Sequence, residues 1–516
     1  MKRPEKTKDV FGIAGFSVDI DRGARESLAD QISAAVGRAI REGQLGPGAR
    51  LPSWHDLAAQ LGVARGTVRM AYENLRDQQL IVTAGAAGTR VAEDARPAAS
   101  GLTLARATPA PARPGRPGIF QIGVPSHDAF PFKTWSRIMG RAARAAAAAP
   151  VGYPDPSGEI ELRSEIAAYL SIARGIVCAP SQIFICNGFG GALAAVLRAL
   201  GMEGKSAWME EPGFSVSREI LRMSGVTPVP VPVDAEGLDV AAGMAAAPQA
   251  SLAIVTPGQQ APLGMTLSLR RRHALLEWAA ASGAWVIEDD YLGELQLQGR
   301  ATPALASLDR EGRVVHIGTF SKTINPGLRV GFLMVPPALV DAVTQVVTVY
   351  SAAPTPTVQL AVAEFMRDGH YLRHLRRMKR LYAERRRLLM QCLRELSVPA
   401  VEAGLAVLVP LADGVDDVAA VAKAREVGMS PAALSWWHAQ PGRRDRGLLL
   451  GVTNVQEQQV AEHCVRLAGI CAARQGAAYA SRKGKVRAGD RWECRANARY
   501  FLLLIHLNRT RRRHRF

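Results

Sequence analysis

The sequence predicts an α/β protein with a mostly parallel sheet, preceded by a small helical domain. From about residue 119 to 470, short apolar runs such as IFICNG, SLAIVTPG, AWVIEDDY and VVHIGTF alternate with helical stretches, which is typical of a sheet covered by helices on both faces. Before this region, residues 26–91 carry apolar side chains at helical spacing. The length of 516 residues favours two to four folding units, at roughly 100–200 residues per domain.

The domain limits follow from composition. Residues 92–118 are rich in Pro, Ala, Gly and Arg and show no sustained apolar period, which is typical of a linker. We therefore expect an N-terminal domain over 20–92, a flexible linker over 93–118 and a large domain over 119–473. Residues 474–516 lack a periodic core and are expected to form a basic tail outside the fold; a native tail and a frameshifted terminus are both compatible with this segment.

The net charge of +18 is unevenly distributed. Residues 474–516 contain thirteen Lys or Arg against two acids and supply +11, so the rest of the chain carries +7. Net charge alone is therefore no argument for DNA binding. The six scattered cysteines form no CxxC pair, which favours a reduced cytoplasmic protein. We find neither an apolar leader nor a run of about 20 apolar residues, and we expect no membrane segment.

The N-terminal domain is expected to contain three helices and a hairpin. Apolar residues recur at helical spacing over 28–40, and GQLGPG at 43–48 ends that helix. Ser53 is a candidate N-cap of a short second helix, Gly62 provides a turn, and apolar residues over 68–75 mark one face of a third helix. Residues 81–91, with two glycines at their centre, are typical of a two-stranded wing.

The second and third helices have helix-turn-helix spacing. Arg65, Thr67 and Arg69 cluster at the start of the third helix, where side chains enter the major groove and the helix N-terminus favours phosphate. Arginine suits guanine edges or phosphates, and threonine suits a phosphate or a thymine methyl group. A small helical oligomerisation module with solvated arginines would show the same spacing.

The stretches GQLGPGARLPS and LAAQLGVARGTVRMAYENL, with the GxxGT of the wing, resemble the GntR family of winged helix-turn-helix regulators. The resemblance implies a double-stranded DNA operator as partner. Near LPS this chain has a histidine where the family usually has an arginine, and Gln79 replaces the usual glycine after the recognition helix. The candidate DNA contacts are His55, Arg65, Thr67, Arg69 and the wing near Gly88.

The strongest chemical signal is GTFSKTINPGLRVGF at 318–332, after the strand-like VVHI. A lysine at the end of a buried strand, here Lys322, can form a Schiff base while Ser321 and Arg329 hold a phosphate. A lone lysine after a strand is usually a surface residue, so this assignment depends on the segments described next.

A second strand, AWVIEDDY, places Asp289 at its C-terminal end, where a carboxylate can pair with a pyridinium nitrogen. Tyr291 follows two residues later on the same side and can hydrogen-bond the ring hydroxyl. Glu288 and Asp290 are also typical of helix caps.

Two further segments complete the candidate site. Phe214, in EEPGF, is placed to stack on a pyridine ring, although an aromatic residue after a turn is more often part of the core. NGFGGAL at 187–193 ends a strand and opens a helix, so its backbone N–H groups, including those of Gly190 and Gly191, can cradle a phosphate.

These motifs resemble fold type I pyridoxal phosphate enzymes of the aspartate aminotransferase kind, and the chain to about residue 473 resembles the MocR subfamily of GntR regulators. YPDPSGEIELRSEIAAYLSIARGI, VTPGQQAPLGMTLS and VIEDDYLGEL match that subfamily's pattern. The resemblance implies pyridoxal 5'-phosphate on Lys322, with Asp289 on the ring nitrogen, Tyr291 near the ring oxygen, and Ser321 with Arg329 on the phosphate. It also implies a small C-terminal α+β subdomain and a domain-swapped homodimer.

The chain departs from the subfamily pattern at several positions. Gly190 and Gly191 stand where the subfamily typically has two glutamines, which leaves only the backbone cradle. Gln259 replaces a usual histidine, Ala261 stands in the slot of the aminotransferase asparagine, and Ala406 replaces the histidine of GLH.

One further feature, an arginine for the substrate carboxylate, distinguishes a regulator from an enzyme. In RDRGLLLGVT no arginine occupies the strand position that aminotransferases use for the substrate carboxylate. Arg444 or Arg446 could substitute, although both are more typical of solvated loop charges. We therefore expect a DNA-binding regulator that senses pyridoxal phosphate or an amino acid or amine through an aldimine at Lys322. The alternatives are an active aminotransferase with an ancillary DNA-binding segment and a degenerate remnant that binds nothing.

Overall fold

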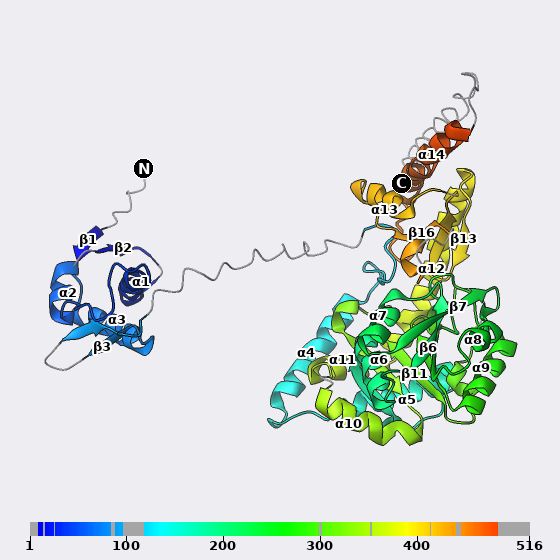
Figure 1. Cartoon of the computed structure of the whole chain (residues 1–516), viewed down its shortest axis with the longest axis horizontal. Helices are drawn as coiled ribbons and strands as arrows, with labels where there is room; N and C mark the ends of the chain where they lie inside the picture. Colours follow the sequence, from blue (N-terminus) through cyan, green and yellow to red (C-terminus); the bar gives the residue numbers. More distant parts are fainter. Residues whose placement is uncertain are drawn as a thin grey trace, which may run out of the picture. The chain divides into compact units, whose positions relative to one another are not determined.

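The computed structural model describes residues 9–482 apart from 14–15, 25, 84–87, 96–117, 298, 300–301, 351–352, 413 and 440–444. The chain forms two compact units, which divide between Pro114 and Gly115 (Figure 1). Most of the expected linker, the tip of the wing and the tail from residue 483 onward lie outside the described residues.

The first unit is built from three helices and two hairpins. Its elements are β1 (Asp9–Ile13), β2 (Phe16–Ile20), α1 (Leu28–Arg41), α2 (Trp54–Leu61), α3 (Arg65–Asp77), β3 (Ile81–Thr83) and β4 (Thr89–Val91). The Ser53 side chain accepts the N–H of Asp56, so the expected cap of α2 is present. Gly62, with φ of 59°, ends α2 in the left-handed conformation and turns the chain into α3.

The structure differs from the expected domain limits at both ends. Strand β2 begins before the expected start at residue 20, and its alternating residues Val18 and Ile20 are fully buried against the helices of the first unit. At the other end, α14 (Val460–Arg482) continues past the expected limit at residue 473. Cys464, Leu467 and Cys471, in the part of this helix before that limit, lie on one face and join the core of the second unit.

The second unit is organised around an eight-stranded sheet in the order β5-β12-β11-β10-β9-β6-β7-β8. Only β12 and β8 run antiparallel to their neighbours, so the sheet is mostly parallel as expected. Its strands are β5 (Ile183–Asn187), β6 (Ser206–Glu211), β7 (Thr227–Asp234), β8 (Gly237–Leu238), β9 (Leu252–Val255), β10 (Trp285–Asp290), β11 (Val314–Thr319) and β12 (Val330–Met334).

Helices cover both faces of this sheet, and strand β5 shows why. Ile183 and Ile185 pack with the cluster of α5, α11 and α12, whereas Phe184 and Cys186 pack with that of α6, α7 and α10. The helices are α4 (Phe132–Ala148), α5 (Ile160–Arg174), α6 (Gly188–Ala199), α7 (Ser215–Met223), α8 (Val240–Ala246), α9 (Leu269–Ser282), α10 (Val340–Tyr350), α11 (Pro356–Arg367) and α12 (His370–Glu395). The expected α/β class is therefore confirmed.

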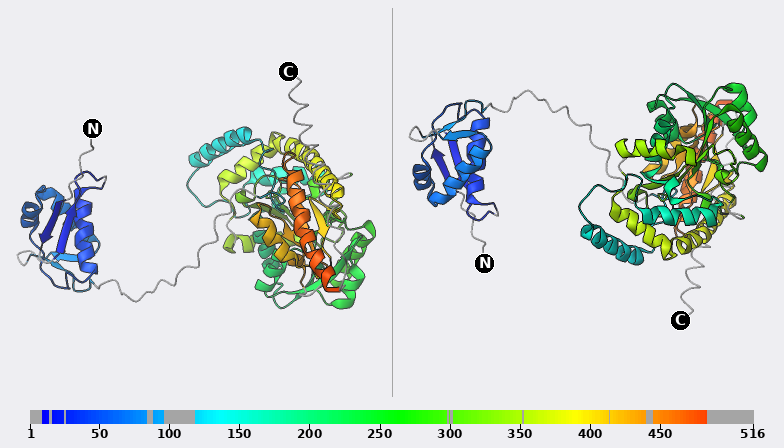
Figure 2. Two further views of the ribbon diagram at one scale, coloured as in Figure 1. Left: turned by 90° about the horizontal axis from the view of Figure 1, so that it is seen from above. Right: turned by 90° about the horizontal axis from the view of Figure 1, so that it is seen from below.

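A smaller α+β part follows α12. It contains β13 (Val401–Ala403), β14 (Ala406–Pro410), α13 (Asp417–Glu426), β15 (Ala432–Ala433), β16 (Gly447–Gly451) and α14, the long orange helix in Figure 2. Its four strands form a separate sheet in the order β13-β14-β16-β15. Across the part of the chain that the structure describes, no helix is long and apolar enough to cross a bilayer.

Candidate functional site

Lys322 lies three residues after β11, at the carboxyl end of the central sheet. Its Nζ donates a hydrogen bond to the backbone oxygen of Gly123 at 2.9 Å. Burial lowers the pKa of the Lys322 amine; the nearby Asp289 opposes this effect and Arg329 adds to it. A lowered pKa increases the fraction of neutral amine, which is the form that can act as a nucleophile.

Asp289 lies at the carboxyl end of the adjacent strand β10 and is 6% exposed. Its Oδ1 is buried and has no hydrogen-bond partner among the described residues. Burial raises the pKa of Asp289 well above its usual range, the negative charges of Asp290 and Glu210 add to this rise, and Lys322 opposes it. The carboxyl group can thus receive a donor that none of the described residues provides.

The two acids beside Asp289 have structural partners. Glu288 accepts two backbone N–H groups of the short turn Leu305–Ser307 at 2.7 and 3.0 Å, and its other contact is Nδ1 of His316 at 3.0 Å. Asp290 accepts a hydrogen bond from Nε of the buried Arg174 at 2.7 Å. Glu288 therefore acts as the cap that its sequence position also suggested, and only Asp289 is left for a ligand.

Arg329 and the first turn of α6 form one corner of the site. Nη2 of Arg329 donates to the backbone oxygen of Asn187 at 3.2 Å, at the end of β5. Gly188 opens α6 with φ of +74°, and a Cβ at this position would lie 3.0 Å from the same Nη2. Gly190 and Gly191 lie in the same turn. The unpaired N–H groups of a helix N-terminus and a guanidinium together suit a phosphate.

Aromatic side chains border the site on another side. The ring of Phe214, which precedes α7, lies 6.0 Å from that of Phe189 and 5.7 Å from that of Trp437. Trp437 comes from the α+β part of the chain, so this border joins both parts of the second unit. Ser321 is buried beside Lys322, and burial raises the pKa of the Tyr291 hydroxyl, which stays protonated and able to donate.

The structure adds residues that sequence reasoning missed. Glu210, at the end of β6, is buried close enough to Asp289 to affect its pKa, and it accepts the N–H and the hydroxyl of Thr256 at 3.1 and 2.5 Å. Burial raises the pKa of Glu210 to about 7, although its hydrogen bonds oppose this. The acidic pair before PGF was a usable signal for Glu210. Gly123 has no such signal, because its role is a backbone oxygen supplied from a distant loop.

One of the two arginines that could substitute for a carboxylate-binding arginine has a buried acidic partner. Arg446 lies 3.3 Å from Oδ1 of Asp417, which is fully buried. Asp417 also accepts the N–H and hydroxyl of Ser435, so the pair ties α13 to the loop before β16. In β16 itself, residues 448–450 are buried leucines. Arg444 lies outside the described residues.

The predicted DNA contacts lie on α2, on α3 and at the wing: His55, Arg65, Thr67, Arg69 and Gly88. The two arginines and the histidine are exposed, and the threonine is half-buried. Gly88 has φ of +83°, and a Cβ there would lie 3.3 Å from Nε of Arg50. Arg50 therefore packs against the wing, a contact that the sequence did not indicate.

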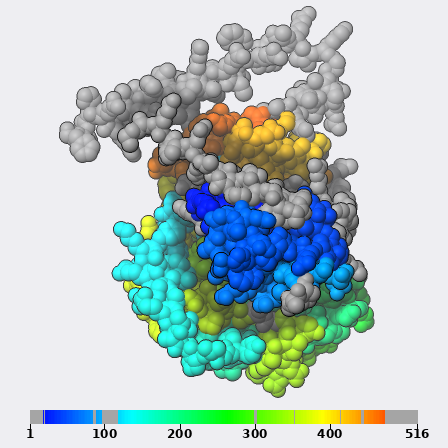
Figure 3. Space-filling view, turned by 90° about the vertical axis from the view of Figure 1, so that its left-hand side faces the viewer, coloured from blue at the N-terminus to red at the C-terminus, as the bar shows by residue number. Residues whose placement is uncertain are grey.

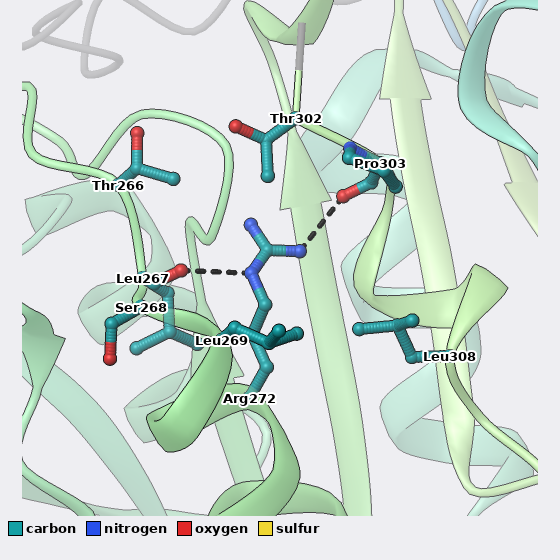
Figure 4. A pocket seen from close by; sticks show the side chains of 8 residues that line it. All are labelled: Thr266, Leu267, Ser268, Leu269, Arg272, Thr302, Pro303 and Leu308. Atoms are coloured by element: carbon teal, nitrogen blue, oxygen red, sulfur yellow. Dashed lines mark hydrogen bonds between the residues drawn. The ribbon is translucent and has the colours of Figure 1, made fainter.

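A pocket of about 260 Å³ lies elsewhere, at the start of α9 (Figure 4). Arg272 fills its base and donates to the backbone oxygens of Leu267, Pro303 and Pro257 at 2.7–2.8 Å. Because these carbonyls already engage all three guanidinium nitrogens, we interpret Arg272 as structural. None of the predicted site residues lines this pocket.

Comparison with known families assigns both units. Residues 28–91 match the bacterial regulatory proteins of the gntR family, and residues 121–427 match aminotransferase class I and II. The chain is 33% identical over 465 residues to the probable rhizopine catabolism regulatory protein MocR of Rhizobium meliloti, covering 86% of this chain and 93% of that protein. It is 30% identical to the pyridoxine biosynthesis transcriptional regulator PdxR of Corynebacterium glutamicum, over 82% and 92% of the two chains.

Solved structures show the same fold for the second unit. An archaeal alanine:glyoxylate aminotransferase matches with a TM-score of 0.64 at 23% identity, covering 70% of this chain and 92% of that one. A kynurenine aminotransferase from Pyrococcus horikoshii matches with a TM-score of 0.63 at 24% identity over 70% and 92% of the chains. The second unit therefore has the fold of fold type I aminotransferases.

Proposed function

The chain belongs to the MocR-type regulators of the gntR family, and from this membership and its site geometry we propose a pyridoxal phosphate-dependent, DNA-binding transcriptional regulator. Its second unit senses pyridoxal phosphate, or an amino compound that reacts with it, at Lys322. Ligand binding at Lys322 changes the affinity of the first unit for its operator. Two sites of one molecule are coupled in this sense when a ligand at one site alters binding at the other.

The observation that carries the cofactor assignment is the unpaired Oδ1 of Asp289. Leaving a buried acceptor without a donor costs about 1–3 kcal/mol, so such atoms usually have a functional reason. A protonated pyridine nitrogen is a donor of the required kind, and it would keep Asp289 ionised despite its raised pKa. Bound pyridoxal phosphate supplies an electrophilic carbon and an electron-withdrawing ring.

The other residues fit the remaining parts of this cofactor. Arg329 and the first turn of α6 would hold the phosphate, and Phe214 would contact the ring face. The Tyr291 hydroxyl would donate to the ring oxygen. Lys322, held by the oxygen of Gly123, would supply the amine for covalent attachment, and its lowered pKa favours the neutral form that this requires.

The ion pair of Arg446 favours sensing over efficient transamination. An amino-acid substrate needs a cation that fixes its carboxylate, and a misplaced substrate loses orders of magnitude in rate. Here Arg446 is bound to the buried Asp417, and the strand that follows it, β16, carries buried leucines. We therefore propose a sensor that binds amino compounds without rapid turnover.

We also propose that the second unit forms a homodimer, with the domain-swapped arrangement implied by the resemblance. Val151 and Tyr153, in the loop after α4, are as exposed as in an extended chain, at 108% and 104%, and Ile160, the first residue of α5, is half exposed. Helix α4 itself lies at the surface of this unit, in cyan in Figure 3. Large apolar side chains exposed in one segment are typical of a subunit interface.

Absorption spectroscopy tests the cofactor site. We expect the purified chain with pyridoxal phosphate to show the visible band of a lysine-bound cofactor, removed by borohydride. Lys322→Ala should abolish the band and leave the far-ultraviolet circular dichroism unchanged, whereas the control Lys205→Ala, at an exposed position directly before β6, should retain the band. An unchanged, reducible band in Lys322→Ala would refute the assignment of the lysine.

A further inference from the structure

The first half of α12 presents an unusually basic surface. Between Asp368 and Glu384, residues 369–383 contain four arginines and one lysine and no acidic residue. The buried side of this segment consists of Tyr371, His374, Leu375, Met378 and Tyr382. On the opposite side Arg373, Arg376, Arg377 and Arg380 are all exposed, at the i, i+3, i+4 and i+7 spacing of one helix face.

The three central arginines of this face lack acidic partners. Arg376, Arg377 and Arg380 make no hydrogen bond or ion pair with any residue that the structure describes. The second half of the same helix is different, because Arg387 pairs with Glu384 at 2.8 Å and Arg386 pairs with Glu402 at 3.0 Å. Among the described residues, the arginines of α12 that form ion pairs thus lie in its second half.

This arrangement does not stabilise the helix. Like charges one turn apart, such as Arg376 and Arg380, repel each other and cost a few tenths of a kcal/mol per pair. A glutamate at either position would give a favourable pair with its neighbour, as Glu384 does with Arg387. An exposed row of unpaired guanidinium groups instead fits a polyanion, since arginine binds phosphate oxygens through two N–H groups at once.

We propose that Arg376, Arg377 and Arg380 form a second DNA-contacting surface, which binds backbone phosphates of the DNA flanking the operator. This inference rests on the proposed function, because the first unit brings the chain to DNA. Contacts to phosphates position a protein without reading sequence, so the surface would add affinity and leave the choice of operator to α3. We call these three residues the α12 arginine cluster.

The length of the chain permits such a contact. Residues 96–117 number 22, and a stretch of 22 residues in any polypeptide can span up to about 75 Å. At 3.4 Å per base pair this corresponds to roughly 20 base pairs of DNA on either side of the operator. Flanking DNA of about that length should therefore be needed for the α12 arginine cluster to contribute.

The test compares two DNA fragments and two variants of the full-length chain. The duplex is first selected by the wild-type protein from a random pool, then prepared alone and with about 20 additional base pairs on each side. In the test variant Arg376, Arg377 and Arg380 are changed to Gln, a good helix former that removes only the charge. The matched control removes three exposed arginines elsewhere, with Arg222→Gln, Arg387→Gln and Arg394→Gln.

We expect the wild type and the control to bind the long fragment roughly tenfold or more tightly than the short one at about 0.1 M salt, and the test variant to bind both equally. The slope of log affinity against log salt on the long fragment should fall in the test variant by about 2–3 for each protomer that contacts the flanking DNA, at roughly 0.9 per lost phosphate contact. The cofactor absorption band should be the same in all three proteins, which shows that the second unit is folded.

Three outcomes would overturn the inference. The first is an equal preference for the long fragment, with the same salt slope, in the test variant and the wild type. The second is an equal loss in the control, which would mean that only net charge matters. The third is a test variant that binds DNA as the wild type does but no longer binds vesicles of phosphatidylserine and phosphatidylcholine, which would assign the cluster to a membrane surface. If the wild type selects no duplex, the proposed function itself is wrong, a result distinguishable from all three.

Discussion

Replacing Glu210 by Gln should flatten the dependence of stability on pH. Burial raises the pKa of Glu210 from 4.5 to about 7 in the folded chain. Between these two pH values the folded chain holds a proton that the unfolded chain has lost, so the free energy of unfolding falls as pH rises, by about 1.4 kcal/mol per pH unit. From pH 4.5 to pH 7 this amounts to roughly 3 kcal/mol, and Glu210→Gln, which cannot ionise, should not show that part of the loss.

Urea unfolding at a series of pH values measures this effect. Trp54 is the sole tryptophan before residue 115, so tryptophan fluorescence mainly reports the second unit. Asp289 also has a raised pKa and contributes a loss of stability of the same sign. Because the charge of Glu210 adds to the pKa rise of Asp289, the difference between wild type and variant reports Glu210 together with its effect on Asp289. Glu203→Gln, at an exposed loop position, is the control and should follow the wild type. Parallel profiles for wild type and Glu210→Gln between pH 4.5 and 7.5 would refute the reasoning.

Three other predictions concern the cofactor corner, the DNA-binding helix and the loop before β16. Gly188→Ala should weaken pyridoxal phosphate binding about tenfold, because its Cβ would lie 3.0 Å from a guanidinium nitrogen and the left-handed conformation costs about 1–2 kcal/mol. The control Gly190→Ala, whose Cβ would make an ordinary 3.6 Å contact, should bind the cofactor nearly normally. Equal titration curves for the two variants would contradict this prediction. Arg65→Ala with Arg69→Ala should weaken DNA binding in a gel-shift assay and leave the cofactor band unchanged, and retained affinity would exclude α3 as the reading helix. Arg446→Ala should lower the free energy of unfolding by about 1–3 kcal/mol through its buried partner, while the spectral response to added amino acids stays the same; a lost response would instead make it the carboxylate-binding group.

The overall fold could be predicted from sequence because its determinants are local. Apolar runs that end in polar or glycine-rich turns marked the strands that carry Asn187 and Asp289 and the strand that precedes Lys322. The two ends of the fold were placed less well. Val18 and Ile20 belong to a short hairpin whose apolar alternation spans too few residues to stand out in the sequence. At the other end, α14 contains few large apolar residues after Cys471.

The candidate site was predictable where a residue acts through its own side chain at a strand end. Asp289 and Lys322 were singled out in this way, and in the structure they lie close enough for the charge of each to shift the pKa of the other. Gly123 and Gly188 were not singled out, because they matter through a backbone oxygen and through the absence of a Cβ, both of which depend on segments far apart in the chain. Arg446 could be named from the sequence but its partner could not, since the buried acid that binds it lies 29 residues away in sequence.

The most direct test of the account is the affinity of the full-length chain for its selected duplex, measured with and without pyridoxal phosphate. Coupling between two sites of one protein typically changes affinity by 5- to 150-fold, so we expect a change of at least about fivefold for the wild type and none for Lys322→Ala. Equal affinities of the wild-type chain in the two conditions, at a concentration where the cofactor band shows full loading, would contradict a regulator controlled through this site.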